Sequence, residues 1–374
     1  MIVKSLTGKY RLACAFFILI SFLQLSAQQF DPVTFLNTRV AESSGLNFVH
    51  ERLISHNDSD GKPELFELDS ISGEVLRTVF LKNASNVDWE AVCSDDHYMY
   101  IGDFGNNYGA RTDLRVYRLS LDDYLTGDTD TLMVDTIRFS YSDQTDFTPK
   151  PYASNYDAET LLAFSDSLWI FTKNWKDAKC NIYKVAKTPG DQVAYLRDSI
   201  NPYGLITDAT YNTTSQKILL CGYTDEYPLM VEIDEFTKTP LSLKPVSRTQ
   251  LGVFDGYSAK IEGIAATGTD NYLVTSEKST TGKASLFRLR FSDKNSIIHV
   301  TNGKNEVIYD PVQKMLFTIY NEPVEISVYE ITGKICIRNG RSPLDISALP
   351  SGIYIVRLKW QGHIVGLRKI YVLS

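Results

Sequence analysis

Short runs of alternating apolar and polar residues, typical of half-buried β-strands, recur through residues 30–300. One pattern opens such a run five times: an acidic residue among small and apolar residues. Its copies are Glu42–Leu46, Asp88–Val92, Asp157–Leu161, Asp208–Tyr211 and Ile261–Ala265. A polar turn and further short strands follow each copy. Four short strands in a unit of roughly 50 residues are typical of one blade of a β-propeller.

The strands predicted after each copy fall into three sets. Second strands are predicted at 98–102, 168–172, 218–222 and 272–275, third strands at 65–68, 116–119, 182–185, 230–233 and 286–289, and fourth strands at 76–80, 136–139, 194–197 and 246–249. The last unit lacks a fourth strand, and the strand-like segment Val33–Arg39 stands before the first unit without a blade of its own. We therefore predict an all-β fold, a five-bladed β-propeller closed by this N-terminal strand.

The stretch from residue 140 to Asn155 is rich in turn-forming residues. We interpret it as an inserted loop. If it contains further strands, the alternative is a six-bladed propeller.

Residues 305–374 show the same alternation in shorter runs, at 315–319, 324–329, 352–358 and 369–373. This pattern predicts a small β-sandwich of the immunoglobulin or fibronectin type. Its motifs are Val307–Pro311, Val328–Lys334, Leu344–Tyr354 and Lys369–Ile370. In this order they resemble the type A C-terminal sorting domain of the type IX secretion system of Bacteroidota, which usually has Asn-Pro where this chain has Asp310-Pro311. The resemblance implies export across the outer membrane, followed by release or surface attachment; the alternative is a fibronectin-like accessory domain.

The N-terminus has the features of a secretory signal peptide. Lys4, Lys9 and Arg11 precede an apolar run from Leu12 to Leu25, and Ser26-Ala27 offers a cleavage site. The run is short for a membrane span, although an uncleaved anchor is the alternative. We predict a signal peptide at 1–27, a propeller at 28–300 and a sorting domain at 305–374. The expected location is extracellular or on the outer-membrane surface, reached through the periplasm.

Charge, cysteine spacing and the catalytic motifs that the sequence lacks narrow the range of possible functions further. The chain has 374 residues and a formal charge of −7, which does not favour nucleic-acid binding. No second segment is apolar enough to span a membrane once the signal is cleaved. Cys93, Cys180, Cys221 and Cys336 lie in strand-like stretches without metal-ligand spacing, so we expect buried thiols rather than disulfide bonds. No Gly-x-Ser-x-Gly, His-Glu-x-x-His or P-loop motif is present.

The repeated acids are the candidate site. In a propeller the first strand of each blade lines the central channel, so Glu42, Glu90, Glu159 and Glu262, with Asp208 as a weaker fifth member, should point toward one channel mouth. Converging carboxylates need a cation or basic partners, and Ca²⁺ or Mg²⁺ suits such oxygen ligands. The metal candidates are Glu90, Glu159, Glu262 and Asp103. Alternatively, each acid accepts backbone hydrogen bonds and holds neighbouring blades together.

Polar loops over the same mouth supply candidate ligand-binding residues. These are Glu42, Asp103, Asn106, Asn107, Lys173, Trp175, Tyr223 and Glu277, and the rings that could stack on a sugar are Trp89, Trp175, Tyr223 and Tyr257. The phrases Asp88–Val92 and Tyr100–Asn107 resemble those of secreted bacterial propellers of the SdiA-regulated and phytase-like (esterase-like) type. That resemblance implies a propeller of a kind that often binds Ca²⁺. It does not imply a catalytic mechanism for this chain.

Three functions remain open at this point. The first is an exported propeller that binds a glycan, peptide or protein at an acidic mouth supported by Ca²⁺. The second is a glycosidase or phosphoesterase in which Glu90, Glu159 and Glu262 supply the catalytic carboxyl groups. The third is a passive scaffold. The expected partners are the type IX secretion machinery and an extracellular ligand.

Overall fold

A computed structural model describes residues 28–59, 61–224, 227–234, 245–291, 307–310, 314–318, 325–330, 334–360 and 363–372. The predicted signal peptide lies outside these residues. So do Pro311 and residues 331–333 of the sorting-domain motifs.

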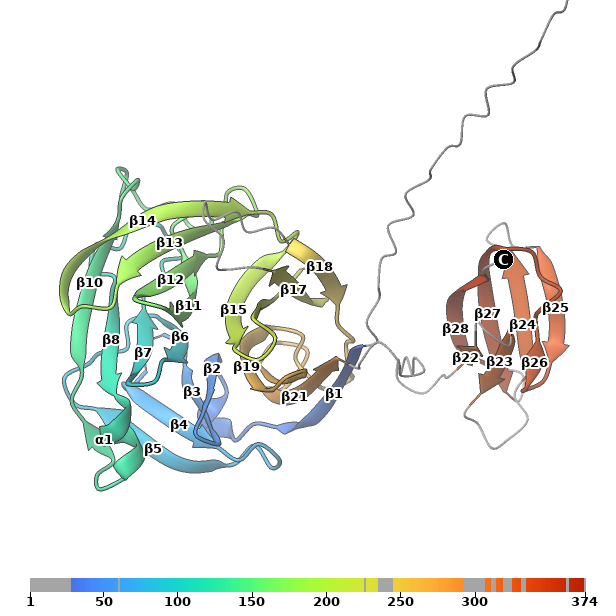
Figure 1. Ribbon diagram of the computed structural model, residues 1–374, viewed down its shortest axis with the longest axis horizontal. Coiled ribbons are helices and arrows are strands. Elements are labelled where there is room, and N and C mark those ends of the chain that lie inside the picture. The colour runs from blue at the N-terminus through green and yellow to red at the C-terminus, as the bar shows by residue number, and fades with distance from the viewer. Residues whose placement is uncertain are drawn as a thin grey trace, which may run out of the picture.

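Strands within residues 28–291 form four sheets, which are arranged around a common centre (Figure 1). The first contains β2 (Ser43–Val49), β3 (Arg52–Asn57), β4 (Glu64–Leu68), β5 (Val75–Leu81) and β9 (Thr131–Leu132). The second has eight strands, in the order β11 (Ala158–Phe164), β12 (Ser167–Thr172), β13 (Cys180–Ala186), β14 (Gly190–Ile200), β10 (Asp135–Tyr141), β8 (Arg115–Ser120), β7 (Tyr98–Asp103) and β6 (Trp89–Ser94). The third contains β15 (Leu205–Asn212), β16 (Lys217–Tyr223), β17 (Pro228–Asp234) and β18 (Pro245–Gln250). The fourth contains β19 (Ile261–Gly268), β20 (Asn271–Ser276), β21 (Ser285–Phe291) and β1 (Gln28–Phe35).

The strands that open the five sequence units form a closed circuit. Strand β2 contacts β6, β6 contacts β11, β11 contacts β15, β15 contacts β19, and β19 returns to β2. They lie toward the middle of the arrangement in Figure 1, with the later strands outside them. The fold is all-β and propeller-like, and the acidic patterns of the sequence stand at its centre.

Apolar side chains from neighbouring sheets hold this arrangement together. Ile54 and Leu65 of the first sheet belong to one buried cluster with Ile101 and Tyr117 of the second. Full burial of one such aliphatic side chain stabilises a fold by about 1.5–3 kcal/mol. The neighbouring residues Leu53 and Phe66 belong to a different buried cluster. These strands are therefore buried on both faces, and their side chains alternate between two clusters rather than between a cluster and solvent.

The N-terminal strand closes the last sheet, but earlier in the chain than predicted. Strand β1 pairs antiparallel with β21, with Phe30 opposite Leu289, and ends at Phe35. The expected strand reached Arg39, whereas Thr38–Val40 forms a 3-10 helix. Asn37 causes this break, since its side chain accepts a hydrogen bond from the backbone N–H of Arg39 at 3.0 Å.

The segments between the predicted strands can also be compared with the structure. Residues 142–157 contain no helix or strand, which agrees with an inserted loop. The helix α1 (Leu121–Thr126) and the short strand β9 were not predicted. Ser120 caps α1 at its start and Gly127, at φ 71°, ends it.

The C-terminal strands form two sheets around one core. The smaller has β22 (Val307–Asp310), β23 (Met315–Thr318) and β26 (Leu344–Asp345), and the larger has β25 (Ile335–Gly340), β24 (Glu325–Glu330), β27 (Gly352–Trp360) and β28 (His363–Val372). Leu316 of the smaller sheet is buried in one cluster with Ile326 and Val356 of the larger. This is the sandwich arrangement that the alternation predicts.

The four cysteines among the described residues are unpaired thiols. Cys93, Cys180 and Cys221 are buried as expected, whereas Cys336 is only half-buried. Among the described residues, no helix has the length and apolar character that crossing a membrane requires.

Candidate functional site

A β-bulge recurs at the same place in each central strand. One residue of each is left out of register with the second strand: Gly45 in β2, Glu90 in β6, Glu159 in β11, Thr207 in β15 and Glu262 in β19. A bulge redirects a side chain from the normal alternation of the strand. The three glutamates therefore occupy equivalent positions, and two units carry glycine or threonine there.

The other two acids of the predicted set do not occupy this position. Asp208 follows the bulge residue of its strand, and its buried carboxylate accepts the backbone N–H groups of Leu46 at 3.2 Å and Ile264 at 2.9 Å. It therefore links β15 to β2 and β19, as the alternative interpretation of the repeat expects. Glu42 acts through its backbone, because its carbonyl oxygen accepts the N–H of Asp58 at 2.9 Å.

The bulge glutamates are buried around a lysine. Glu90, Glu159 and Glu262 are only 5%, 2% and 6% exposed. Lys173, directly after β12, donates from Nζ to Oε1 of Glu159 at 2.8 Å. This ammonium group is therefore a counter-charge built into the acidic centre.

Burial governs the titration of these groups. It raises the pKa of Glu90 and Glu159 well above the usual range, and it raises the pKa of Glu262 to about 8. Burial alone would lower the pKa of Lys173, but Glu159 and other neighbours outweigh it and hold that pKa well above its usual value. Lys173 therefore remains protonated. Glu262 makes no hydrogen bond or ion pair with the part of the chain that the structure describes, and the charges of Lys173 and Lys260 only partly offset the effect of its burial.

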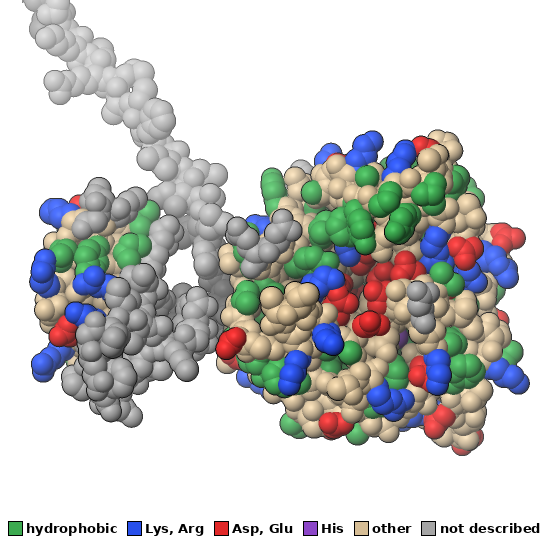
Figure 2. Space-filling model, turned by 180° about the vertical axis from the view of Figure 1, so that it is seen from behind, with side chains coloured by type: hydrophobic (Ala, Val, Ile, Leu, Met, Phe, Trp, Pro, Cys, Tyr) green, Lys and Arg blue, Asp and Glu red, His purple; other side chains and the backbone are tan. Residues whose placement is uncertain are grey.

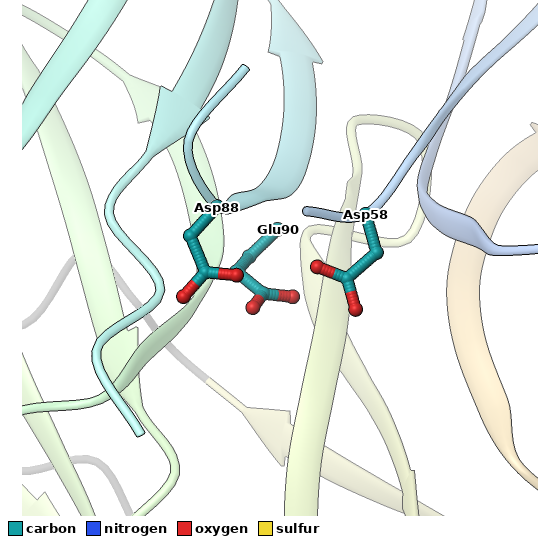
Figure 3. Close-up of side chains that lie close together, drawn as sticks. All are labelled: Asp58, Asp88 and Glu90. Atoms are coloured by element: carbon teal, nitrogen blue, oxygen red, sulfur yellow. The ribbon is translucent and has the colours of Figure 1, made fainter. Parts of the chain in front are cut away.

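Three carboxyl groups, including that of Glu90, point toward one another (Figure 3). An oxygen of each of Asp58, Asp88 and Glu90 lies within 4.8 Å of the others. Asp58 follows β3, Asp88 precedes β6 and Glu90 is the bulge residue of β6. Burial and Glu277 raise the pKa of Asp58 to about 6, and burial and Asp58 raise the pKa of Asp88 to about 7. The group therefore resists carrying its full negative charge without a cation.

One asparagine holds the two loops of this group together. The Asn86 Nδ2 donates to the carbonyl oxygens of Asn57 at 3.1 Å and Asp58 at 2.6 Å. Its Oδ1 accepts the N–H of Trp89 at 3.2 Å. The side chain thereby links the loop carrying Asp58 to the start of β6.

If the group binds Ca²⁺, replacing Asn86 by alanine should weaken that binding by about 10–100-fold, the usual effect of losing a group that orients metal ligands. Calorimetric titration with Ca²⁺ measures this. The control is Asn83→Ala, since Asn83 also spans two loops by accepting the N–H of Val134 at 2.9 Å and donating to its carbonyl at 2.8 Å. Equal losses in the two variants would contradict the orienting role.

Asp103 lies outside the three-carboxylate group. It is fully buried and forms ion pairs with Arg111 at 3.0 Å and Arg115 at 3.6 Å. Asn106 is also engaged in the fold, because its Nδ2 donates to the carbonyl oxygen of Tyr156 at 3.2 Å. Asn107 lines a pocket together with Asp88.

The aromatic candidates also differ in their burial and in their contacts. Trp89 is fully buried and its Nε1 donates to the carbonyl of Ser85 at 2.8 Å, so it cannot stack on a ligand. Trp175 and Tyr223 are half-buried beside Lys173, whose Nζ lies 5.1 Å and 5.8 Å from their ring centres. Tyr257 stacks on Phe35 instead, with ring centres 4.5 Å apart. Of the remaining candidates, Glu277 forms an ion pair with Lys260.

Figure 2 shows one face of the molecule, on which acidic side chains gather in a hollow. The pocket beside the three carboxyl groups has a volume of about 420 Å³ and is lined by Ser59, Val87, Asp88, Asn106, Asn107, Tyr108, Ala110 and Arg111. This size is ordinary for a small-molecule site.

Sequence reasoning identified Glu90 but not its two partners as metal ligands. A signal for Asp88 was present, because Asp88–Glu90 and Asp157–Glu159 share the same Asp-x-Glu spacing. Asp58 and Asn86 carry no repeated pattern. Only folding brings them to the site.

Comparison with known proteins defines the class to which the C-terminal domain belongs. Residues 307–372 match the family model of the secretion system C-terminal sorting domain. The chain therefore ends in a type IX secretion system sorting domain, which indicates export to the cell surface or the extracellular space. No curated protein matches the sequence.

Two solved structures are similar to this chain at low sequence identity. The PQQ-bound aldose sugar dehydrogenase of Streptomyces coelicolor has a TM-score of 0.40 and 11% identity, covering 71% of this chain and 99% of that one. A Bacteroides fragilis protein described as exported has a TM-score of 0.37 and 9% identity, covering 71% of this chain and 96% of that one.

Proposed function

We propose that residues 28–300 form a five-bladed β-propeller that the type IX machinery exports after removal of a signal peptide at 1–27. The eight-stranded sheet counts as two blades, joined where β10 runs parallel to β14. The closed circuit of five central strands supports this count. Residues 305–374 are the sorting domain in this proposal.

We propose further that the acidic mouth of this propeller binds an extracellular ligand with the support of Ca²⁺ held by Asp58, Asp88 and Glu90. The observation that carries the proposal is the convergence of these three carboxyl groups within 4.8 Å. Two oxygens bound to one Ca²⁺ at about 2.3–2.6 Å lie no more than about 5 Å apart, so the group fits this ion.

This metal set differs from the one expected from the sequence. Lys173 already neutralises Glu159, and Arg111 and Arg115 neutralise Asp103. Because Glu159 is committed to its ion pair with Lys173, we assign this mouth to ligand binding rather than to hydrolysis by its glutamates. Ca²⁺ would supply a positive centre there, to which oxygen atoms of a ligand can bind.

Thermal denaturation of the secreted protein with Ca²⁺ and with a chelator tests the proposal. Ca²⁺ at about 100 times its dissociation constant should stabilise the fold by about 2.7 kcal/mol, because it binds only the folded state. Asp88→Asn should abolish this rise in Tm. It should not lower the Tm in chelator, since it removes a repelling carboxylate.

Asp96→Asn is the matched control, because Asp96 is exposed beyond the other end of β6. It should retain the full response to Ca²⁺. Identical Tm values in Ca²⁺ and in chelator for the unmodified protein would refute the cation site.

A further inference from the structure

Three aromatic side chains form a row beside the three-carboxylate group. The ring centres of Tyr108 and Tyr152 are 6.5 Å apart, and those of Tyr152 and Trp175 are 5.0 Å apart. Tyr108 is 54% exposed and Tyr152 is 58% exposed. We call Tyr108, Tyr152 and Trp175 the aromatic row. Large exposed rings grouped in this way commonly mark a binding surface.

The inserted loop fixes this row in place through its backbone. The N–H of Tyr152 donates to the carbonyl of Asn107 at 2.9 Å, and the N–H of Trp175 donates to the carbonyl of Ser154 at 3.0 Å. Tyr152 itself has a φ of 50°, in the left-handed region that bulky residues rarely adopt. A strained residue that holds an exposed ring in position is a common feature of binding sites.

The pocket of about 420 Å³ connects the aromatic row to the acidic group, because Tyr108 and Asp88 both line it. Its other polar walls include the Asn107 amide and the Ser59 hydroxyl. Arg111 adds little free charge, since it is paired with Asp103 and Asp113, each at 3.0 Å. The pocket therefore combines an aromatic face, neutral hydrogen-bonding groups and the proposed Ca²⁺ position.

We propose that this pocket binds a neutral sugar residue of a glycan. The apolar C–H face of a sugar ring packs on an exposed tyrosine, and its hydroxyl groups can reach both the Asn107 amide and a cation at Asp58, Asp88 and Glu90. A basic peptide is disfavoured, because its cationic groups would compete with Ca²⁺ for the same carboxylates. This inference rests on the proposed function and specifies its ligand class.

An array of neutral oligosaccharides, probed with the full secreted protein in Ca²⁺, provides the test, followed by calorimetry with the strongest binder. We expect Tyr108→Ala to weaken that binding at least tenfold, because Tyr108 lines the pocket, and chelator to abolish it. Tyr195→Ala is the control, because Tyr195 is a similarly exposed tyrosine on β14, outside this pocket, at 54% exposure.

The outcomes separate this inference from the proposed function. A rise of Tm in Ca²⁺ without binding of any neutral oligosaccharide would overturn the glycan inference and leave the cation site standing. Binding that Tyr152→Ala and Tyr108→Ala both leave unchanged would also overturn it. If basic peptides bind, and bind only in chelator, the ligand of this pocket is cationic and the glycan inference is wrong.

Discussion

Replacing Lys173 by methionine is expected to lower the free energy of unfolding by about 3–5 kcal/mol, the usual cost of leaving a buried charge without its partner. Lys173 and Glu159 are 2.8 Å apart, and their side chains are only 8% and 2% exposed. Methionine keeps most of the packing volume but removes the charge, so Glu159 and its acidic neighbours lose their internal cation. Urea denaturation at pH 8, followed by circular dichroism, measures the change.

A second variant distinguishes lost charge balance from damaged packing. The double variant Lys173→Met with Glu159→Gln should recover much of the stability, because it removes both members of the pair. Lys184→Met is the control: Lys184 lies 3.5 Å from the exposed Asp166, and a surface pair of this kind contributes about 0.2–1 kcal/mol. If Lys173→Met were as mild as Lys184→Met, Lys173 would not be the central counter-charge.

Replacing Glu262 by glutamine should stabilise the Ca²⁺-free protein at pH 8 and have little effect at pH 5. Burial raises the pKa of Glu262 from 4.5 to about 8 in the folded state. Between these values the folded protein binds a proton that the unfolded chain has lost, so the contribution of Glu262 to stability falls as the pH rises. Glutamine mimics the protonated form at every pH, and the gain at pH 8 should be of the order of 4 kcal/mol.

Melting curves in chelator across pH 5–9 measure this difference. Glu51→Gln is the control, because Glu51 is exposed in the turn between β2 and β3. A Glu262→Gln variant that is less stable than the unmodified protein at pH 8 would mean that Glu262 has a stabilising partner.

The strand pattern could be predicted because its cause is local. Alternation places Ile101 and Val116 in buried clusters, and polar turns between strands recur at regular spacing. The bulge glutamates were also visible as a repeated acidic pattern. Their alignment with Glu42 and Asp208 was wrong, because the bulge position is defined by pairing with the second strand. In the two remaining units that position holds Gly45 and Thr207.

The sequence by itself determined the all-β architecture, the closing N-terminal strand and the C-terminal sorting domain, because periodicity and contiguous motifs encode them. It also placed acids at the central strands. Only the tertiary structure decided which acids meet. Asp58 and Asp88 are 30 positions apart in the chain, and Asn86 holds their loops together. Lys173 meets Glu159 because β11 and β12 pair side by side. The balance of charge in the mouth depends on these distances and on burial, which no linear pattern contains.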